Sequence, residues 1–211
     1  MKFAHAIFPV VALSLFAFAT PASADMMNFT GPELTQWVKF HCDGKLADGM
    51  TVRAGSYGVL LDGREFDAYC VDADQYAGSC EVSVLDIDVL PNHEQIAYLY
   101  ETFSGSAVNS TRAAALGVAL WELLYESEGN AADVTAGEFY ITRNCDVADL
   151  ANSMLTDLPE QYSPVMDLSV LHSPCKQDML IGGLAAVPEP TTMALLFIGA
   201  ALTIVRRRRA C

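Results

Sequence analysis

Residues 113–126 read AAALGVALWELLYE, with no charged residue up to Trp121. A helix on a protein surface carries a polar face at 3.6-residue spacing, whereas this stretch is apolar on every side. Asn109 precedes it as a typical N-terminal cap. The sequence therefore predicts a buried helix over residues 111–126 as the central core element. Gly117 in its middle costs about 1 kcal/mol relative to alanine, which indicates close approach by another backbone or a large side chain.

A β-hairpin is expected upstream of this helix. Two apolar runs, Tyr57–Leu61 and Glu65–Val71, are separated by Asp62-Gly63, and Asp-Gly between such runs is a strong hairpin signal. In the second run Cys70 shares a face with Phe66, because successive side chains of a strand point to opposite faces. We therefore expect the Cys70 thiol to point toward the core.

The other expected elements are shorter. Further strands are expected at Trp37–Phe40, Cys80–Val84, Phe139–Ile141 and Met166–Leu171, and further helices from a cap at Asn92 to Gly105 and from a cap at Asp146 to Pro159. Strands come before helices instead of alternating with them. This order predicts an α+β fold, in which a small β-sheet or hairpin region packs against the central buried helix and further helices.

The N-terminus has the form of a secretory signal peptide. Lys2 precedes an apolar region from Ala6 to Ala19, and Ala22-Ser23-Ala24 supplies a small-residue cleavage site. We assign residues 1–24 to this cleaved segment, which directs the rest of the chain out of the cytoplasm.

The C-terminus has three parts in order. Pro188, Glu189 and Pro190 are followed by an uncharged run of 15 residues and then by Arg206, Arg207, Arg208 and Arg209. As a helix the run is roughly 22 Å long, which is short for a hydrocarbon core that needs about 20 residues. It can still enter a membrane if the arginines snorkel on the cytoplasmic side. The sequence thus predicts a C-terminal membrane helix before processing.

This order resembles the PEP-CTERM sorting signal of Gram-negative bacteria. The resemblance implies that an exosortase, a membrane protease, recognises the tail and processes the chain near the Pro-Glu-Pro. It implies export through the inner membrane and a final place in the envelope, on the outer surface or in the extracellular matrix. A plain tail anchor is the alternative. The expected organisation is a signal peptide (1–24), an ectodomain (25–182), a linker (183–187) and a sorting tail (188–211).

The exported part is strongly acidic. Seven of the 12 basic residues and 25 of the 26 acidic residues lie between Asp25 and Val187, so this part carries a formal charge near −18. Such a surface repels nucleic acid and anionic lipid. We expect a soluble exported domain with no nucleic-acid partner.

Five cysteines lie in the exported part, and an oxidising compartment favours disulfides. A Cys145–Cys175 pair would close a loop of about 30 residues and stabilise the fold by ~3 kcal/mol in the chain-entropy model. Because five is odd, at least one thiol is free or otherwise bonded. Cys70 is either a buried free thiol or the disulfide partner of Cys42 or Cys80. The cysteine spacing does not match structural zinc, and we expect no metal or other cofactor.

Residues 54–126 resemble the thioester (TQXA) domains of bacterial surface proteins. The segments that carry the resemblance are residues 54–57 (AGSY) with 66–72 (FDAYCVD), residues 97–100 (AYLY), and the helix over 113–126. In that family a cysteine bonds to a glutamine four residues before a tryptophan, and the internal thioester can acylate amines on a target surface. Cys70 and Trp121 match this pattern. Position 117 is glycine, so the resemblance implies a thioester-like domain that lacks its acyl donor. The nearest alternative glutamine, Gln95, belongs to another predicted helix.

Two other function classes compete with this interpretation. Four acidic residues could supply oxygen ligands for calcium: Asp72, Asp74, Asp86 and Asp88. Their spacing is not that of an EF-hand, and a solvated acidic loop is the alternative. A hydrolytic exoenzyme using carboxylates is also open, although the histidines are isolated and no nucleophile or phosphate-loop motif is present. We expect a non-enzymatic structural or adhesion protein, with exosortase as processing partner and extracellular polysaccharide or surface proteins as binding partners.

Overall fold

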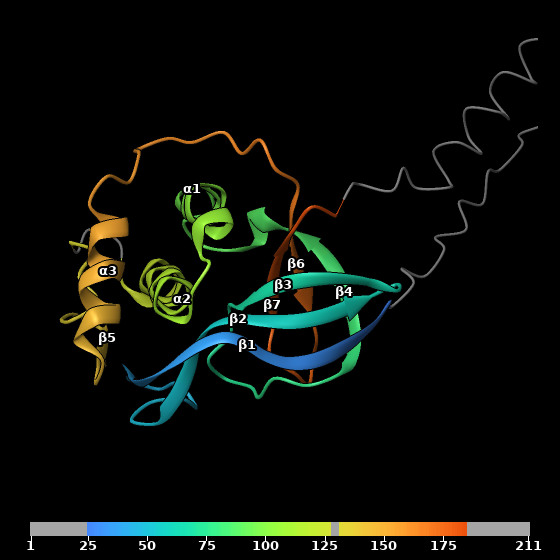
Figure 1. Cartoon of the computed structure of the whole chain (residues 1–211), viewed down its shortest axis with the longest axis horizontal. Helices are drawn as coiled ribbons and strands as arrows, with labels where there is room; N and C mark the ends of the chain where they lie inside the picture. The colour runs from blue at the N-terminus through green and yellow to red at the C-terminus, as the bar shows by residue number, and fades with distance from the viewer. Residues whose placement is uncertain (1–24, 128–130, 185–211) are drawn as a thin grey trace, which may run out of the picture.

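Antiparallel strands and a group of three helices make up the protein in a computed structural model that describes residues 25–127 and 131–184 (Figure 1). The strands are β1 (Asp25–Cys42), β2 (Thr51–Leu61), β3 (Arg64–Cys70), β4 (Cys80–Asp86), β5 (Phe139–Thr142), β6 (Leu168–His172) and β7 (Met179–Gly182). The helices are α1 (His93–Phe103), α2 (Ser110–Tyr125) and α3 (Cys145–Leu155), with short 3-10 turns at Ile87–Val89 and Ser104–Ser106. The predicted α+β class is confirmed.

The strand pairing closes on itself. The order is β2-β3-β7-β6-β4-β1-β5, and β1 pairs with β2 as well as with β4 and β5. Closure satisfies the backbone groups that an open edge would expose. All of the strand pairs are antiparallel. The sheet is larger than the small sheet or hairpin region expected from the sequence.

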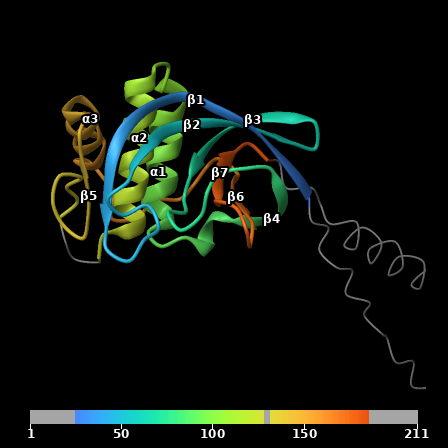
Figure 2. The same cartoon turned by 90° about the horizontal axis from the view of Figure 1, so that it is seen from below.

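β1 is much longer than the expected strand at Trp37–Phe40. Its C-terminal end pairs with β5 and its N-terminal end pairs with β4, and Figure 2 shows it arching between these two neighbours. The pairing with β2 shifts register between Phe29 and Gly31 and again between Pro32 and Thr35. Such irregularities bend a strand and interrupt its alternation. This is why the period-2 pattern of β1 could not be read from the sequence.

The β2–β3 hairpin forms as predicted. Leu61 pairs with Arg64, and the two residues between them adopt positive φ angles, +51° at Asp62 and +77° at Gly63. A two-residue turn with both φ angles positive matches the right-handed twist of the flanking strands. The hairpin places Cys70 at the end of β3, next to β7.

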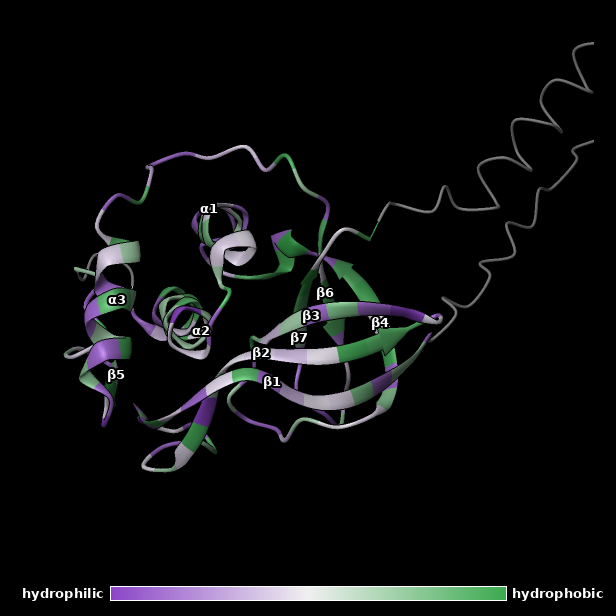
Figure 3. Cartoon of the chain, in the orientation of Figure 1, coloured by the Kyte–Doolittle hydropathy of each residue, from purple (hydrophilic) through white to green (hydrophobic). Residues whose placement is uncertain are grey.

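The central helix α2 also forms as predicted. Its residues from Ala113 to Glu122 are buried, and it packs against β1, β2, α1 and α3 (Figure 1). Asn109 caps it, because its Oδ1 accepts a hydrogen bond from the Arg112 backbone N–H at 3.0 Å. α3, by contrast, alternates hydrophobic and hydrophilic residues in Figure 3, as expected of a helix with one buried face.

Two helix caps differ from the sequence predictions. Asn92 precedes α1 but makes no side-chain cap; its φ is +51°, and its Nδ2 donates to the Leu123 carbonyl at 2.7 Å. α3 is capped by Asn144, whose Oδ1 accepts from the Val147 N–H, and not by Asp146. In both cases the asparagine before the helix, Asn92 or Asn144, adopts the left-handed conformation that the chain needs at the helix start.

The terminal segments lie outside the described residues. These are the signal peptide (1–24), the end of the linker and the sorting tail (188–211). Within residues 25–127 and 131–184, no helix is long and apolar enough to cross a membrane.

Candidate functional site

Cys70 lies at the C-terminal end of β3 with its thiol inside the protein. Its Sγ donates to the Asp72 carbonyl oxygen at 3.0 Å. Burial raises the pKa of the Cys70 thiol to about 12, because the charged thiolate would lose its hydration. The thiol is therefore protonated at neutral pH and is a poor nucleophile.

Trp121 reaches Cys70 from α2. Its Nε1–H donates to the Cys70 carbonyl oxygen at 2.9 Å in a buried hydrogen bond. The indole also packs edge-on against Phe40, with the ring centroids 5.4 Å apart. The structure thus brings together the two residues that carried the family resemblance, through the backbone of one and the side chain of the other.

Gly117 lies one turn before Trp121, against the backbone of β2. A Cβ at this position would lie 3.0 Å from the Gly55 nitrogen and 3.5 Å from the Gly55 Cα, with the Tyr69 ring next to them. The predicted close approach at Gly117 is confirmed. Any side chain at position 117 would require the β2 backbone at Gly55 to shift slightly, because its first atom already makes a tight contact there.

Two glutamines that the sequence did not single out lie near Cys70. Gln177 Nε2 donates to the Asp72 carbonyl oxygen at 2.6 Å, and this is the same oxygen that accepts from the Cys70 thiol. Gln75, Gln177 and Cys70 all line one pocket, described below. The alternative considered from the sequence, Gln95, lines a different pocket beside Glu122. No sequence pattern near Gln177 indicates that it lies beside Cys70, because the loop before β7 brings the two together only in the folded protein.

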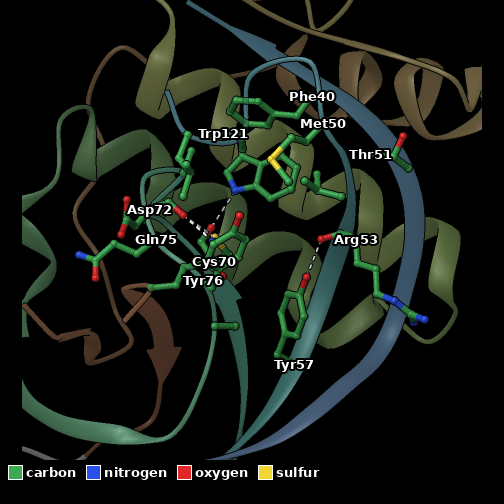
Figure 4. Close-up of a pocket in the computed structure, with 16 residues that line it drawn as sticks. Phe40, Met50, Thr51, Arg53, Tyr57, Cys70, Asp72, Gln75, Tyr76 and Trp121 are labelled. Atoms are coloured by element: carbon green, nitrogen blue, oxygen red, sulfur yellow. Dashed lines mark hydrogen bonds between the residues drawn. The ribbon is translucent and has the colours of Figure 1, made fainter. Parts of the chain in front are cut away.

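A pocket of about 260 Å³ opens beside the Cys70 thiol (Figure 4). Its walls come from the ends of β1 and β3, the start of β2, α2 and three loops. The residues that line it are Phe40, Leu46, Ala47, Met50, Thr51, Val52, Arg53, Tyr57, Cys70, Asp72, Ala73, Gln75, Tyr76, Ala77, Trp121 and Gln177. In Figure 4 the Arg53 guanidinium points away from the thiol, so the interior is formed mainly by apolar and aromatic side chains.

The cysteines do not pair as the sequence suggested. Cys42, Cys70, Cys80, Cys145 and Cys175 are all free. The predicted Cys145–Cys175 disulfide is wrong, because Cys145 begins α3 while Cys175 lies in the loop between β6 and β7. These parts lie on different sides of α2 in both cartoon views, and a disulfide needs Cα atoms within about 7 Å. Of the alternatives for Cys70, the structure contains the buried free thiol.

The acidic residues considered for calcium have local partners. Asp72 Oδ1 accepts from the Asp74 N–H at 2.8 Å, and Asp74 forms a salt bridge with Lys45 at 2.8 Å. Asp86 caps the 3-10 turn by accepting from the Asp88 N–H. Over the described part of the chain, no group of three or more acidic, histidine or cysteine side chains is placed to hold a metal ion.

Glu122 is a buried carboxyl group that the sequence did not single out. The residue is fully buried, its Oε1 accepts from the Asp133 N–H at 2.8 Å, and its Oε2 has no partner among the described residues. Burial raises the pKa of Glu122 to about 7, and the negative charges of Glu126 and Asp133 act in the same direction. The sequence could have marked Glu122 as a buried carboxyl group, because it follows Trp121 directly on a helix that is otherwise apolar.

Comparison of the sequence with protein families finds one motif. Residues 186–209 match the PEP-CTERM protein-sorting motif. The chain therefore carries the tail of an exported protein that is sorted to the cell surface or the extracellular space, and the resemblance noted from the sequence is confirmed for this segment.

The chain also resembles a solved structure. It is similar to the N-terminal domain of the Streptococcus pyogenes pilus tip adhesin Cpa, with 14% sequence identity and a TM-score of 0.42, over 78% of this chain and 100% of that chain. At this level the similarity supports no conclusion about function. A comparison with curated proteins finds no match.

Proposed function

We propose that this chain is a structural or adhesion component of the cell surface or extracellular matrix, released from its tail by an exosortase. The PEP-CTERM motif at residues 186–209 carries this proposal. The acidic ectodomain suits a soluble exported protein, because its charge near −18 keeps it away from nucleic acid and anionic lipid. Its role is binding rather than catalysis, toward surface proteins or extracellular polysaccharide.

The thioester-like site acts without forming a covalent bond. Position 117 offers no carboxamide, and the Gly55 backbone occupies the space next to it. The Cys70 thiol is buried, protonated and hydrogen-bonded to the Asp72 carbonyl oxygen. These observations support a domain that keeps the cysteine and tryptophan for packing and binds its partner non-covalently.

Intact-mass measurement of the purified exported protein tests this point. We expect the mass of the processed chain with no loss of ammonia, because a Cys–Gln thioester expels one ammonia molecule. Incubation with methylamine is expected to leave the mass unchanged. A mass lower by one ammonia, followed by a gain of one methylamine after incubation, would contradict the proposal. A Cys70→Ala variant would show whether Cys70 forms the thioester responsible for these changes.

Deletion of residues 188–211 tests the sorting. We expect the truncated protein to lose its association with the envelope and to appear in soluble fractions, since the apolar run and the arginines are gone. A second variant, with Pro188, Glu189 and Pro190 replaced by alanine, keeps membrane affinity and is expected to accumulate unprocessed in the membrane. Normal processing of that variant, or unchanged envelope retention after deletion, would contradict exosortase sorting.

A further inference from the structure

The mouth of the pocket beside Cys70 is built from two loops that expose large apolar side chains. Leu46 and Met50 lie on the loop between β1 and β2, and Tyr76, 63% exposed, lies on the loop between β3 and β4. The loops are fixed to each other, because the Ala47 N–H donates to the Ala73 carbonyl at 3.1 Å. Apolar side chains gathered at a pocket mouth mark an interaction site more often than an ordinary surface.

The interior of the pocket has few hydrogen-bond donors to offer a ligand. Trp121 Nε1 donates to the Cys70 carbonyl, the Tyr57 hydroxyl to the Arg53 carbonyl at 2.5 Å, and Gln177 Nε2 to the Asp72 carbonyl. A phosphate, carboxylate or sugar needs such donors, and these three are already used. The interior therefore suits an apolar group.

The size of the pocket limits that group. Sites for drug-sized molecules are about 300–1,000 Å³, whereas this pocket measures about 260 Å³. It is large enough for one aliphatic or aromatic side chain. A single side chain in a desolvated pocket is the usual anchor of a protein–protein contact.

The charges around the mouth favour a basic partner. The two loops carry Asp43, Asp48, Asp72 and Asp74, against Lys45, which is already paired with Asp74. Two further cations lie nearby: Lys176 lies next to Gly78, and Arg53 lines the pocket but stacks its guanidinium on the Trp37 ring at 4.5 Å. Asp72 lines the pocket and forms no salt bridge within the described residues. Burial raises the pKa of Asp72, and the charges of Asp178 and Asp74 raise it further, so a ligand cation here would relieve this repulsion.

We propose that the pocket receives one large apolar side chain from a basic peptide segment of a partner protein, with flanking lysine or arginine residues beside Asp72. This inference rests on the proposed non-covalent role of the Cys70 site. It names the chemistry of the partner: an apolar anchor between basic residues, carried by a protein rather than by a polysaccharide.

Blocked pentapeptides test the proposal on the purified exported protein, with backbone and indole N–H resonances as the readout. We expect Lys-Lys-Phe-Lys-Lys to shift the Trp121 indole resonance. Lys-Lys-Ala-Lys-Lys, which lacks the anchor, and Glu-Glu-Phe-Glu-Glu, which reverses the charge, are each expected to bind at least about fivefold more weakly. Raising the salt from ~50 to ~300 mM is expected to weaken binding of the first peptide, because exposed charges are screened.

Matched variants place the binding at this pocket. Tyr76→Ala removes an exposed wall, Ala77→Phe fills the interior, and Asp72→Asn removes the carboxylate charge; each is expected to weaken binding of Lys-Lys-Phe-Lys-Lys by about fivefold or more. Val165→Ala alters an apolar side chain that is 90% exposed and does not line the pocket, and it is expected to leave binding unchanged.

Three results would overturn the proposal. They are equal binding of the Phe and Ala peptides, binding of the Glu peptide as tight as that of the Lys peptide, and shifts of the same pocket resonances by maltohexaose without any by the peptides. The proposal would also be overturned if Tyr76→Ala, Ala77→Phe and Asp72→Asn each bound Lys-Lys-Phe-Lys-Lys as tightly as the wild type. Export and the missing thioester are tested by localisation and mass, so failure of the peptide experiment leaves those results standing.

Discussion

Replacement of Trp121 by alanine is expected to lower the free energy of unfolding by ~3–5 kcal/mol, the usual range for truncating a large buried aromatic side chain. Trp121 is 4% exposed and packs against Phe40 and Phe139. Its loss also leaves the Cys70 carbonyl without its indole donor in a buried place. Urea unfolding followed by circular dichroism measures the change in midpoint and slope.

The other tryptophan supplies a matched control. Trp37 is 45% exposed on β1 and stacks with the Arg53 guanidinium, so Trp37→Ala is expected to cost about 1 kcal/mol or less. Trp121→Phe separates the two contributions of the indole, since it keeps much of the packing and removes the hydrogen bond. A Trp121→Ala loss no greater than that of Trp37→Ala would show that the indole does not hold β3 to α2.

Stability is expected to fall as the pH rises from about 5 to 8, and Glu122→Gln is expected to remove much of that fall. The pKa of Glu122 is raised from 4.5 to about 7 in the folded protein by burial, with Glu126 and Asp133 adding repulsion. The folded state thus binds a proton that the unfolded state has released. This contribution is fully present below about pH 4.5 and is lost as the pH rises through about 7.

The size of the effect follows from the shift. At ~1.4 kcal/mol for each pH unit between the pKa values of 4.5 and about 7, the contribution of Glu122 is at most ~3.5 kcal/mol. Urea unfolding at several pH values measures it as the difference between the wild-type and Glu122→Gln profiles. Glu81→Gln, on the exposed side of β4, is the control and is expected to keep the wild-type slope. Parallel profiles of the wild type and Glu122→Gln would contradict the prediction.

Local patterns predicted the parts of the fold that short stretches of chain decide. An Asp-Gly pair between apolar runs marked the β2–β3 hairpin, and an apolar run without charge marked α2 as the core helix. The strand β1 was underestimated because its register shifts hide the alternation. β7, with four residues, was missed because so short a run has no period of its own.

The candidate site divides in the same way. The sequence singled out Cys70, Gly117 and Trp121, and it showed that position 117 lacks a carboxamide. It could not show that Gln177 and Cys70 share the Asp72 carbonyl oxygen, since these residues meet through the pairing of β3 with β7. It also suggested a Cys145–Cys175 disulfide, because loop length carries no information about which elements lie between two cysteines.

The sequence by itself determined that this protein is exported and sorted, and it identified the central helix. A sorting tail and an apolar run are both properties of contiguous residues. The tertiary structure alone decided that the strands close on themselves, that the Gly55 backbone lies close to position 117, and that two loops form an apolar mouth beside Cys70. Each of these depends on which distant segments pair. That choice is made by the burial of the whole core and not by any one stretch of it.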